Sequence, residues 1–273
     1  MLIDTKVMLH GKLRSDHAAA ISPLHEGFLY GHGLFETIKV VAGRPVFLPA
    51  HHARLVASAR ALDLPYALTL DALRERILTL VNANSLDEGS VKVVVFNQED
   101  ETGELILTRP IVYSAETYAR GFRLQTRRTG QRINGLSGHK TLNYLENIRA
   151  RRAAIAAGCD EMLFIDAVGQ VVEGAGTNLF VVRDGVALTP PLSVGPLPGI
   201  ARGLVLALLG PDRAREAPVD IALLHDATEV FVTNALMGVM PVSRIENHDY
   251  DLAKNPFTRA LQKNYRAAEL KNT

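Results

Sequence analysis

The stretch between residues 130 and 158 constrains the possible folds most strongly, because a glycine-rich segment there leads into a helical pattern. Gly130, Gly135 and Gly138 allow sharp turns and let another group approach the main chain closely. Thr141 is placed to cap the helix that follows. That helix is predicted to end at Gly158. The prediction rests on apolar residues along one side, which are Leu142, Leu145, Ile148 and Ile155.

Lys140 stands between the glycines and this helix. A lysine near a helix N-terminus lies in positive potential, so its amine loses a proton more easily and becomes a better nucleophile. The alternative is an ordinary surface lysine at a loop–helix junction, because most lysines are solvated. The spacing alone leaves both interpretations open.

Composition limits the class of protein. The 273 residues are 47% hydrophobic and 22% charged, which is typical of a globular chain with one large or two modest domains. The formal net charge of +1 gives no electrostatic case for nucleic acid or for a membrane surface as a partner. No signal-peptide core is evident, and no apolar stretch approaches the roughly 20 residues of a membrane span. The single Cys159 excludes an internal disulfide and suits a reducing cytoplasm.

In the first part of the chain, helical and strand patterns alternate. Lys92 alternates with Val91 and Val93, so we expect it to point to solvent. Pro110 lies inside a predicted strand and indicates an edge or a bulge. The pattern predicts a strand and a turn over 1–11, strands over 37–41, 46–48, 91–96 and 105–114, and helices over 49–62 and 70–83.

In the second part, residues 115–123 are the best candidate for a domain boundary. A small-residue bend at 174–178 separates two strands, and a Pro/Gly turn at 195–199 precedes an apolar helix. The tail after Asn255 is predicted to be a basic amphipathic helix on the surface. Strands are expected over 161–165, 179–182 and 229–233, and the apolar helix over 200–209.

Several polar residues have both a structural and a functional interpretation. Arg54 is either a solvent-facing arginine or a clamp for an anion, because a guanidinium matches phosphate. Glu173 is either a solvated turn residue or a carboxylate that faces a basic ring nitrogen. The amides that begin the 200–209 helix could hold an anion, and so could Thr233-Asn234. The pair His51-His52 has no third ligand at a useful spacing, so no metal is predicted.

Four motifs, in this order, resemble the fold-type IV family of pyridoxal-phosphate enzymes. A further stretch that fits the family runs from Gly31 through His32, Phe35 and Glu36 to Thr37. The motifs are His51-x-x-Arg54-Leu55, Lys140-Thr141-Leu142-Asn143-Tyr144-Leu145, Val172-Glu173-Gly174-x-x-x-Asn178-Leu179-Phe180 and Leu197-Pro198-Gly199-Ile200.

This resemblance implies a role for each matching residue. Lys140 would form a Schiff base with pyridoxal 5'-phosphate and then carry protons. Arg54 would hold the phosphate, and Glu173 would keep the pyridine nitrogen protonated, which makes the ring an electron sink. The remaining cofactor contacts would come from amides and smaller groups: Ile200, Ala201, Asn234, Ala235, Tyr144 and Thr177.

The resemblance also implies the architecture. We expect an α/β (α+β) enzyme with a smaller N-terminal α/β domain at 1–116 and a connection at 117–128. A larger C-terminal domain with a barrel-like sheet and the cofactor lysine would occupy 129–273. Family members are typically homodimers, so a homodimer is expected, acting on a small-molecule substrate.

Within the family, the sequence most resembles 4-amino-4-deoxychorismate lyase, a folate-biosynthesis enzyme that releases 4-aminobenzoate and pyruvate. D-amino-acid transaminases usually carry an Arg and a His where this chain has the acidic stretch 97–103. Phe35, His32 and Lys39 are candidate substrate contacts, and Lys39 could equally be structural. The alternatives are an aminotransferase of the D-amino-acid or branched-chain type, or a catalytically silent pyridoxal-phosphate-binding protein.

Overall fold

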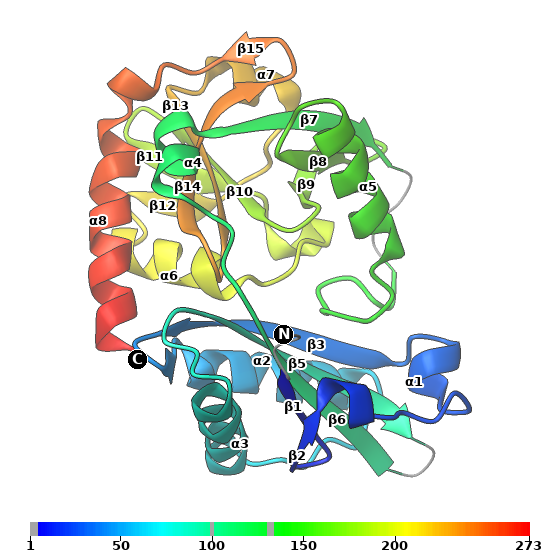
Figure 1. Ribbon diagram of the computed structural model, residues 1–273. Coiled ribbons are helices and arrows are strands. Elements are labelled where there is room, and N and C mark those ends of the chain that lie inside the picture. The colour runs from blue at the N-terminus through cyan, green and yellow to red at the C-terminus, as the bar shows by residue number, and fades with distance from the viewer. Residues whose placement is uncertain (1–4, 99–100, 130–133) are drawn as a thin grey trace. The chain divides into compact units, whose positions relative to one another are not determined.

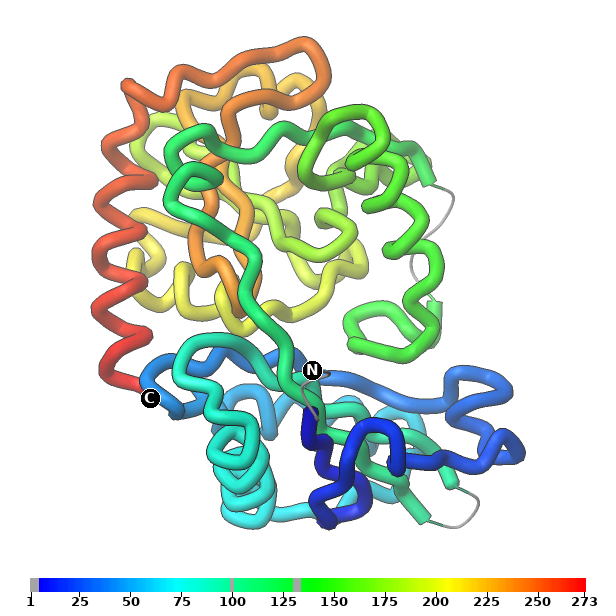
Figure 2. Tube along the Cα trace, viewed as in Figure 1, coloured from blue at the N-terminus to red at the C-terminus, as the bar shows by residue number. Residues whose placement is uncertain are grey.

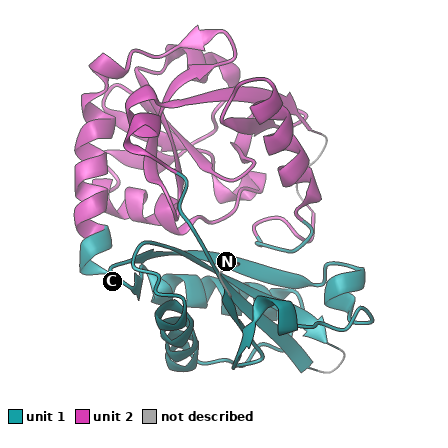
Figure 3. Cartoon of the chain, viewed as in Figure 1, with its two compact units in different colours: residues 1–112, 139–143, 269–273 teal, residues 113–138, 144–268 magenta. Residues whose placement is uncertain are grey.

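The computed structural model describes residues 5–98, 101–129 and 134–273. The chain forms two compact units, shown in separate colours in Figure 3. Unit 1 comprises residues 1–112, 139–143 and 269–273, and unit 2 comprises 113–138 and 144–268. Residues 139–143, which include Lys140, thus belong to the first unit although they lie far along the sequence; the chain path can be followed in Figure 2. The domain limits that the family resemblance implies, at residues 116 and 129, stay a prediction.

Unit 1 is built on one antiparallel sheet (Figure 1). Its central strand β5 places Val91, Val93 and Val95 on a fully buried face. Strand β6 ends before Pro110, so the predicted strand over 105–114 was wrong at its end: proline has no N–H for the ladder. The order is β2-β1-β6-β5-β3-β4, with β1 (Lys6–Leu9), β2 (Lys12–Ser15), β3 (Gly33–Val41), β4 (Arg44–Pro45), β5 (Gly89–Gln98) and β6 (Glu101–Arg109).

Two helices cover one face of this sheet (Figure 1). They are α2 (Leu48–Ala61) and α3 (Leu70–Ala83), which confirms both predicted helices. The Thr69 hydroxyl accepts a hydrogen bond from the amide of Ala72 and caps α3. The short elements α1 (Glu26–Leu29) and η1 (Asp16–Ala18) complete the unit.

Unit 2 contains a nine-stranded mixed sheet that curls into a half-barrel, as the family resemblance implies (Figure 1). The pairs β11–β12, β14–β7 and β7–β8 are parallel. The order is β12-β11-β10-β13-β14-β7-β8-β9, with β15 beside β14. The bounds are β7 (Phe122–Arg128), β8 (Glu161–Ile165), β9 (Val171–Gly174), β10 (Asn178–Arg183), β11 (Val186–Thr189), β12 (Ala214–Glu216), β13 (Glu229–Asn234), β14 (Gly238–Ile245) and β15 (His248–Asp249).

The helices of this part are α4 (Ala115–Arg120), α5 (Leu145–Ala156), α6 (Ile200–Leu209), α7 (Ile221–Asp226) and α8 (Pro256–Lys271), with η2 (Leu192–Val194) and η3 (Leu252–Lys254). Within the described ranges, none of the helices has the length and apolar character needed to cross a bilayer.

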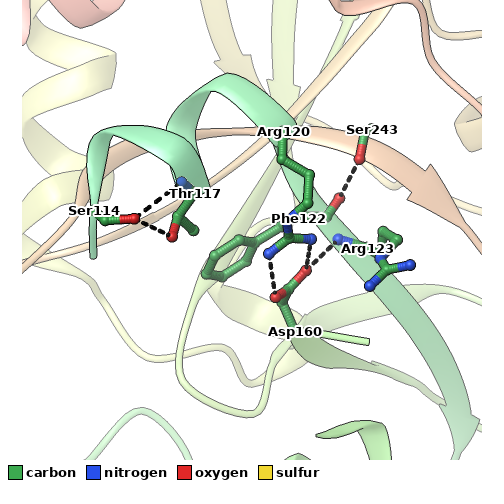
Figure 4. Close-up of polar contacts among 7 residues, drawn as sticks. All are labelled: Ser114, Thr117, Arg120, Phe122, Arg123, Asp160 and Ser243. Carbon is green, nitrogen blue, oxygen red and sulfur yellow. Dashed lines mark hydrogen bonds and ion pairs between the residues drawn. The ribbon is translucent and has the colours of Figure 1, made fainter. Parts of the chain in front are cut away.

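An ion pair fixes the junction between α4 and β7 (Figure 4). Asp160 accepts two hydrogen bonds from the Arg120 guanidinium, both at 2.8 Å, and one from the Arg123 amide. Ser114 caps α4 by accepting from the Thr117 amide. The predicted boundary region at 115–123 is therefore an ordered helix and strand entry of unit 2.

The helix after Lys140 differs from the prediction. It begins at Leu145, so Thr141 lies outside it and does not cap it. The expected apolar face is turned outward, since Leu145, Ile148 and Ile155 are 66%, 41% and 57% exposed. The helix packs instead through the small residues Ala150 and Ala154, which lie against Met162 and Phe164. Their size lets the helix approach β8 closely.

Candidate active site

Lys140 lies on a short extended segment at the edge of β3. Its carbonyl accepts a hydrogen bond from the Phe35 amide at 2.8 Å, and Thr141 forms an antiparallel bridge with Leu34. Residues opposite each other share a face, so Thr141 lies on the helix-covered face with Leu34. Lys140, one residue earlier, therefore lies on the opposite face with Phe35. The lysine is thus positioned by sheet pairing and not by a helix N-terminus.

Two lysines contact the Phe35 ring. The Nζ atom of Lys140 is 4.4 Å from the ring centroid, and the Nζ atom of Lys92 is 4.2 Å from it. Such distances are typical of cation–π contacts. The expectation that Lys92 points to solvent was wrong, because its long side chain folds over a buried aromatic ring. Burial, with the nearby charge of Arg109, lowers the pKa of Lys92.

Arg54 lies on α2, and its guanidinium binds the carboxylate of Glu36 on β3. Its Nε donates to Glu36 Oε1 at 2.8 Å, and its Nη2 donates to Oε2 at 2.6 Å. His51, one helical turn earlier, contacts the same carboxylate through Nδ1 at 2.7 Å. Burial alone would raise the pKa of Glu36, but the hydrogen bond from His51 and the charge of Arg54 outweigh it and lower the pKa to about 2.

The other substrate candidates of unit 1 have structural partners. The Lys39 ammonium donates to both carboxylate oxygens of Glu269, at 2.9 and 3.0 Å. His32 Nδ1 lies 3.0 Å from Glu26 Oε2, and its Nε2 lies 3.2 Å from the Leu62 carbonyl. Their proposed substrate contacts stay predictions.

In unit 2, Glu173 lies at the end of β9 before the small-residue bend. Its Oε2 accepts a hydrogen bond from the Leu197 amide at 2.9 Å. The Asn178 side chain in turn donates to the Leu197 carbonyl at 2.9 Å. Leu197 lies just before α6, so the carboxylate and the start of that helix are held together.

A second carboxylate, Glu161, lies beneath the same bend and was not anticipated. It is 3% exposed and accepts hydrogen bonds from the amides of Met162 and Gly176, at 2.9 and 3.0 Å. Burial raises the pKa of Glu161, and the Met162 amide, the charge of Arg151 and the Gly176 amide oppose that rise only in part. A Cβ atom at Gly174 would meet both Thr177 Oγ1 and Glu161 Cγ, so Thr177 lies on the bend next to Glu161. The sequence signal was a glutamate that opens an otherwise apolar strand.

Two side chains at the start of α5 also contact the bend at 174–178. The Tyr144 hydroxyl and the Asn147 amide both donate to the carbonyl of Ala175, each at 2.9 Å. Tyr144 thus has a structural role within unit 2. Its predicted contribution to the cofactor site stays a prediction.

The start of α6 presents backbone amides without a side-chain cap. Gly199 is the N-cap residue and has no side chain, so the first amides, at Ile200 and Ala201, get no side-chain acceptor from it. Such a helix start suits a phosphate. The adjacent candidate, Asn234, accepts from the amides of Leu236 and Met237 and so shapes the turn that contains Ala235.

These donor sets fit pyridoxal phosphate. In unit 1, Lys140 supplies an amine and Arg54 a guanidinium. In unit 2, Glu173 supplies a carboxylate for a ring nitrogen, and α6 supplies amides for phosphate oxygens. The buried Thr233 hydroxyl has no hydrogen-bond partner among the described residues, which adds an unsatisfied polar group beside Asn234.

Comparisons with known proteins agree with this chemistry. The family model for amino-transferase class IV matches residues 33–245. The aminodeoxychorismate lyase of Bacillus subtilis is 27% identical over 284 residues, covering 97% of this chain and 95% of that protein. The crystal structure of 4-amino-4-deoxychorismate lyase from Pseudomonas aeruginosa is 30% identical with a TM-score of 0.83, covering 96% and 98% of the two chains.

A branched-chain aminotransferase is equally similar in fold. The structure from the archaeon Thermoproteus uzoniensis, with norvaline, is 27% identical with a TM-score of 0.89, covering 98% of this chain and 95% of that one. The comparisons thus include both a lyase and an aminotransferase. The chain belongs to the amino-transferase class IV family, the fold-type IV enzymes that depend on pyridoxal 5'-phosphate.

Proposed function

We propose that this protein is a lyase that converts 4-amino-4-deoxychorismate into 4-aminobenzoate and pyruvate. The observation that carries the proposal is the β5–β6 hairpin, which pairs Asn97 with Thr102 and Gln98 with Glu101. Its sequence over 97–103 has neither the Arg nor the His with which D-amino-acid transaminases trap a substrate carboxylate. The lyases of B. subtilis and P. aeruginosa support the same assignment.

The residues of this chain would divide the chemistry. Pyridoxal phosphate, when bound, supplies the electron sink for the broken C–H bond. The Nζ atom of Lys140 would remove the proton from the ring carbon that bears the amine. Glu173 would hold a proton at the pyridine nitrogen, and Arg54 with the α6 amides would hold the phosphate.

The reaction balances without a second substrate. The ring loses one proton, its C–O bond to the side chain breaks, and enolpyruvate leaves with the ether oxygen, so the ring becomes aromatic. Enolpyruvate takes up a proton at its methylene carbon and becomes pyruvate. No oxidant, reductant or keto acid is consumed, which distinguishes this reaction from amino-group transfer.

The test is formation of fluorescent 4-aminobenzoate from 4-amino-4-deoxychorismate without any keto acid. Multiple turnovers are expected from the holoenzyme. Absence of product, together with turnover once 2-oxoglutarate and an amino acid are added, would overturn the lyase assignment in favour of an aminotransferase. Lys140→Ala should abolish turnover. Unchanged turnover in that variant would contradict the role of the lysine, and no activity in any assay would favour a silent cofactor-binding protein.

We also infer a homodimer that acts in the cytoplasm. Large apolar side chains are exposed in unit 1 at Leu24 (78%), Phe28 (69%) and Tyr30 (71%), which is typical of a surface that a partner covers. Cys159 is a free thiol, in keeping with a reducing compartment. Light scattering of the purified holoenzyme should give twice the mass of the 29.7 kDa chain.

A further inference from the structure

The segment that carries Lys140 is fastened to β3 on one side of the lysine. The Phe35 amide donates to the Lys140 carbonyl at 2.8 Å, and the Leu142 amide donates to the Gly33 carbonyl at 2.9 Å. Both bonds act on the carbonyl side of Lys140 or farther along the chain. Sheet pairing therefore fixes the chain from the Lys140 carbonyl onward.

The chain before Lys140 has a different anchor, the side chain of His139. Its Nδ1 atom lies 3.0 Å from the hydroxyl oxygen of Ser58 on α2. The preceding residue, Gly138, has a φ of +77°, and glycine is the residue type with the greatest backbone freedom. The contact with Ser58 therefore holds the residue that directly precedes the lysine.

The direction of this contact follows from the extended backbone. Side chains alternate along such a segment, so His139 and Thr141 point toward the helices while Lys140 points away from them. Ser58 is 5% exposed and lies one helical turn beyond Arg54, the candidate phosphate ligand. Helix α2 thus positions the guanidinium directly and contacts the lysine segment through His139.

The hydrogen bond restrains the backbone next to Lys140. A buried hydroxyl without a partner is unfavourable, so Ser58 favours the chain path that brings His139 to it. Rotation of the backbone at His139 would change the direction in which the Lys140 side chain leaves the segment. Misplacement of a reacting group by about 1 Å can lower a rate about 100-fold, so this restraint matters for the amine.

We propose that His139 is a positioning residue for Lys140. Through its hydrogen bond to Ser58 it holds the segment so that the lysine amine stays over the Phe35 ring, 4.4 Å from the centroid. The inference rests on the proposed function, in which Lys140 binds the cofactor and moves the proton. The role requires a hydrogen-bonding group at the place of Nδ1 and not an imidazole as such.

The first test follows attachment of the cofactor to Lys140 without any turnover. Apoenzyme is mixed with pyridoxal 5'-phosphate, samples are reduced with borohydride at set times, and mass spectrometry quantifies the labelled Lys140 peptide. His139→Leu should slow attachment about tenfold, since a hydrogen bond of ordinary strength contributes about that factor. Ser58→Ala should have the same effect. The double variant should be no slower than either single variant, because all three lack the same bond.

A conservative variant separates the hydrogen bond from the bulk of the side chain. Asn carries its amide the same number of bonds from Cβ as His carries Nδ1, and Leu has nearly the shape of Asn without polar atoms. His139→Asn should therefore attach the cofactor within about threefold of the wild-type rate, while His139→Leu stays about tenfold slow.

The matched control is another histidine of the same helix. His52→Leu removes a hydrogen bond of 2.8 Å from Nε2 to the Leu68 carbonyl, which does not involve the lysine segment. His52→Leu and His139→Leu should each lower Tm by about 2–4 °C, because each loses one hydrogen bond. Only His139→Leu should slow attachment. In turnover it should lower kcat about tenfold and leave KM nearly unchanged, as expected for a misplaced reacting group.

Wild-type attachment rates in both His139→Leu and Ser58→Ala would overturn the proposal. Equally slow attachment in His139→Asn and His139→Leu would also overturn it, because bulk or an imidazole would then be the requirement. Failure of the proposed function has a different signature. In that case 4-amino-4-deoxychorismate would not be turned over, while attachment of the cofactor to Lys140 would still depend on His139.

Discussion

The Arg54 guanidinium and the Glu36 carboxylate form a two-pronged ion pair, with N···O distances of 2.8 and 2.6 Å. The side chain of Glu36 is 2% exposed and that of Arg54 11%, so the pair is shielded from water. His51 adds a third contact at 2.7 Å. The proposed phosphate ligand is therefore held by strand β3, the same strand whose Phe35 contacts Lys140.

We predict that Glu36→Gln destabilises the protein by roughly 3 kcal/mol, because the positive charge of Arg54 would lose its buried counter-ion. Denaturant unfolding of the apoenzyme measures this free energy. Asp71→Asn is the control: it breaks an exposed ion pair with Arg74 at 2.6 Å and should change stability by less than about 0.5 kcal/mol. Equal effects of the two substitutions would contradict the role of the buried pair.

The same carboxylate predicts an acid-sensitive stability. The pKa of Glu36 is about 2 in the folded protein against 4.5 ordinarily, so the unfolded state takes up its proton first. The stabilisation is complete above pH 4.5 and is lost as the pH falls toward 2. The free-energy difference between the wild type and Glu36→Gln should therefore shrink over this range. A difference that stays constant down to pH 3 would show that Glu36 does not titrate this way.

Elements with strong local signals were predictable from sequence. The helix over 70–83 and the strand over 161–165 have the predicted bounds, because hydrophobic periodicity and a capping threonine act within a few residues. The face of α5 was not predictable, because it depends on which strand the helix meets. Its alanines allow close packing, which outweighs the larger apolar residues on the other side.

The candidate site likewise combines residues that were predictable from sequence with contacts that were not. Motif order selected Lys140, Arg54 and Glu173 as candidates, and these roles stay predictions, whereas the neighbours of these residues depend on contacts between distant segments. Glu36 did have a local signal: it falls in phase with the buried Leu34 and Ile38 on β3, and a charged residue in that phase needs a partner. Lys92 had no such signal, since its contact with Phe35 depends on the pairing of β3 with β5.

The start of α6 gives a steric prediction. A Cβ atom at Gly199 would overlap the Asn178 side chain, which holds the Leu197 carbonyl next to Glu173. Gly199→Ala should therefore weaken cofactor retention at least tenfold, measured by absorbance after dialysis. Gly203→Ala in the same helix is the control: a Cβ atom there would meet no other part of the described chain within 4 Å, so this variant should retain the cofactor and gain up to about 1 kcal/mol of stability. Full cofactor retention in Gly199→Ala would contradict this account.

Tyr144 and Asn147 both donate to the carbonyl of Ala175, so substitutions of the two residues can separate their roles. Tyr144→Phe and Asn147→Ala each remove one donor, and each should cost about 1 kcal/mol of unfolding free energy. The double variant should lose more than the sum, because the buried carbonyl then loses both donors. If Tyr144 acts only on the bend, both single variants will weaken cofactor affinity equally. A loss of affinity confined to Tyr144→Phe would instead assign its hydroxyl to the cofactor.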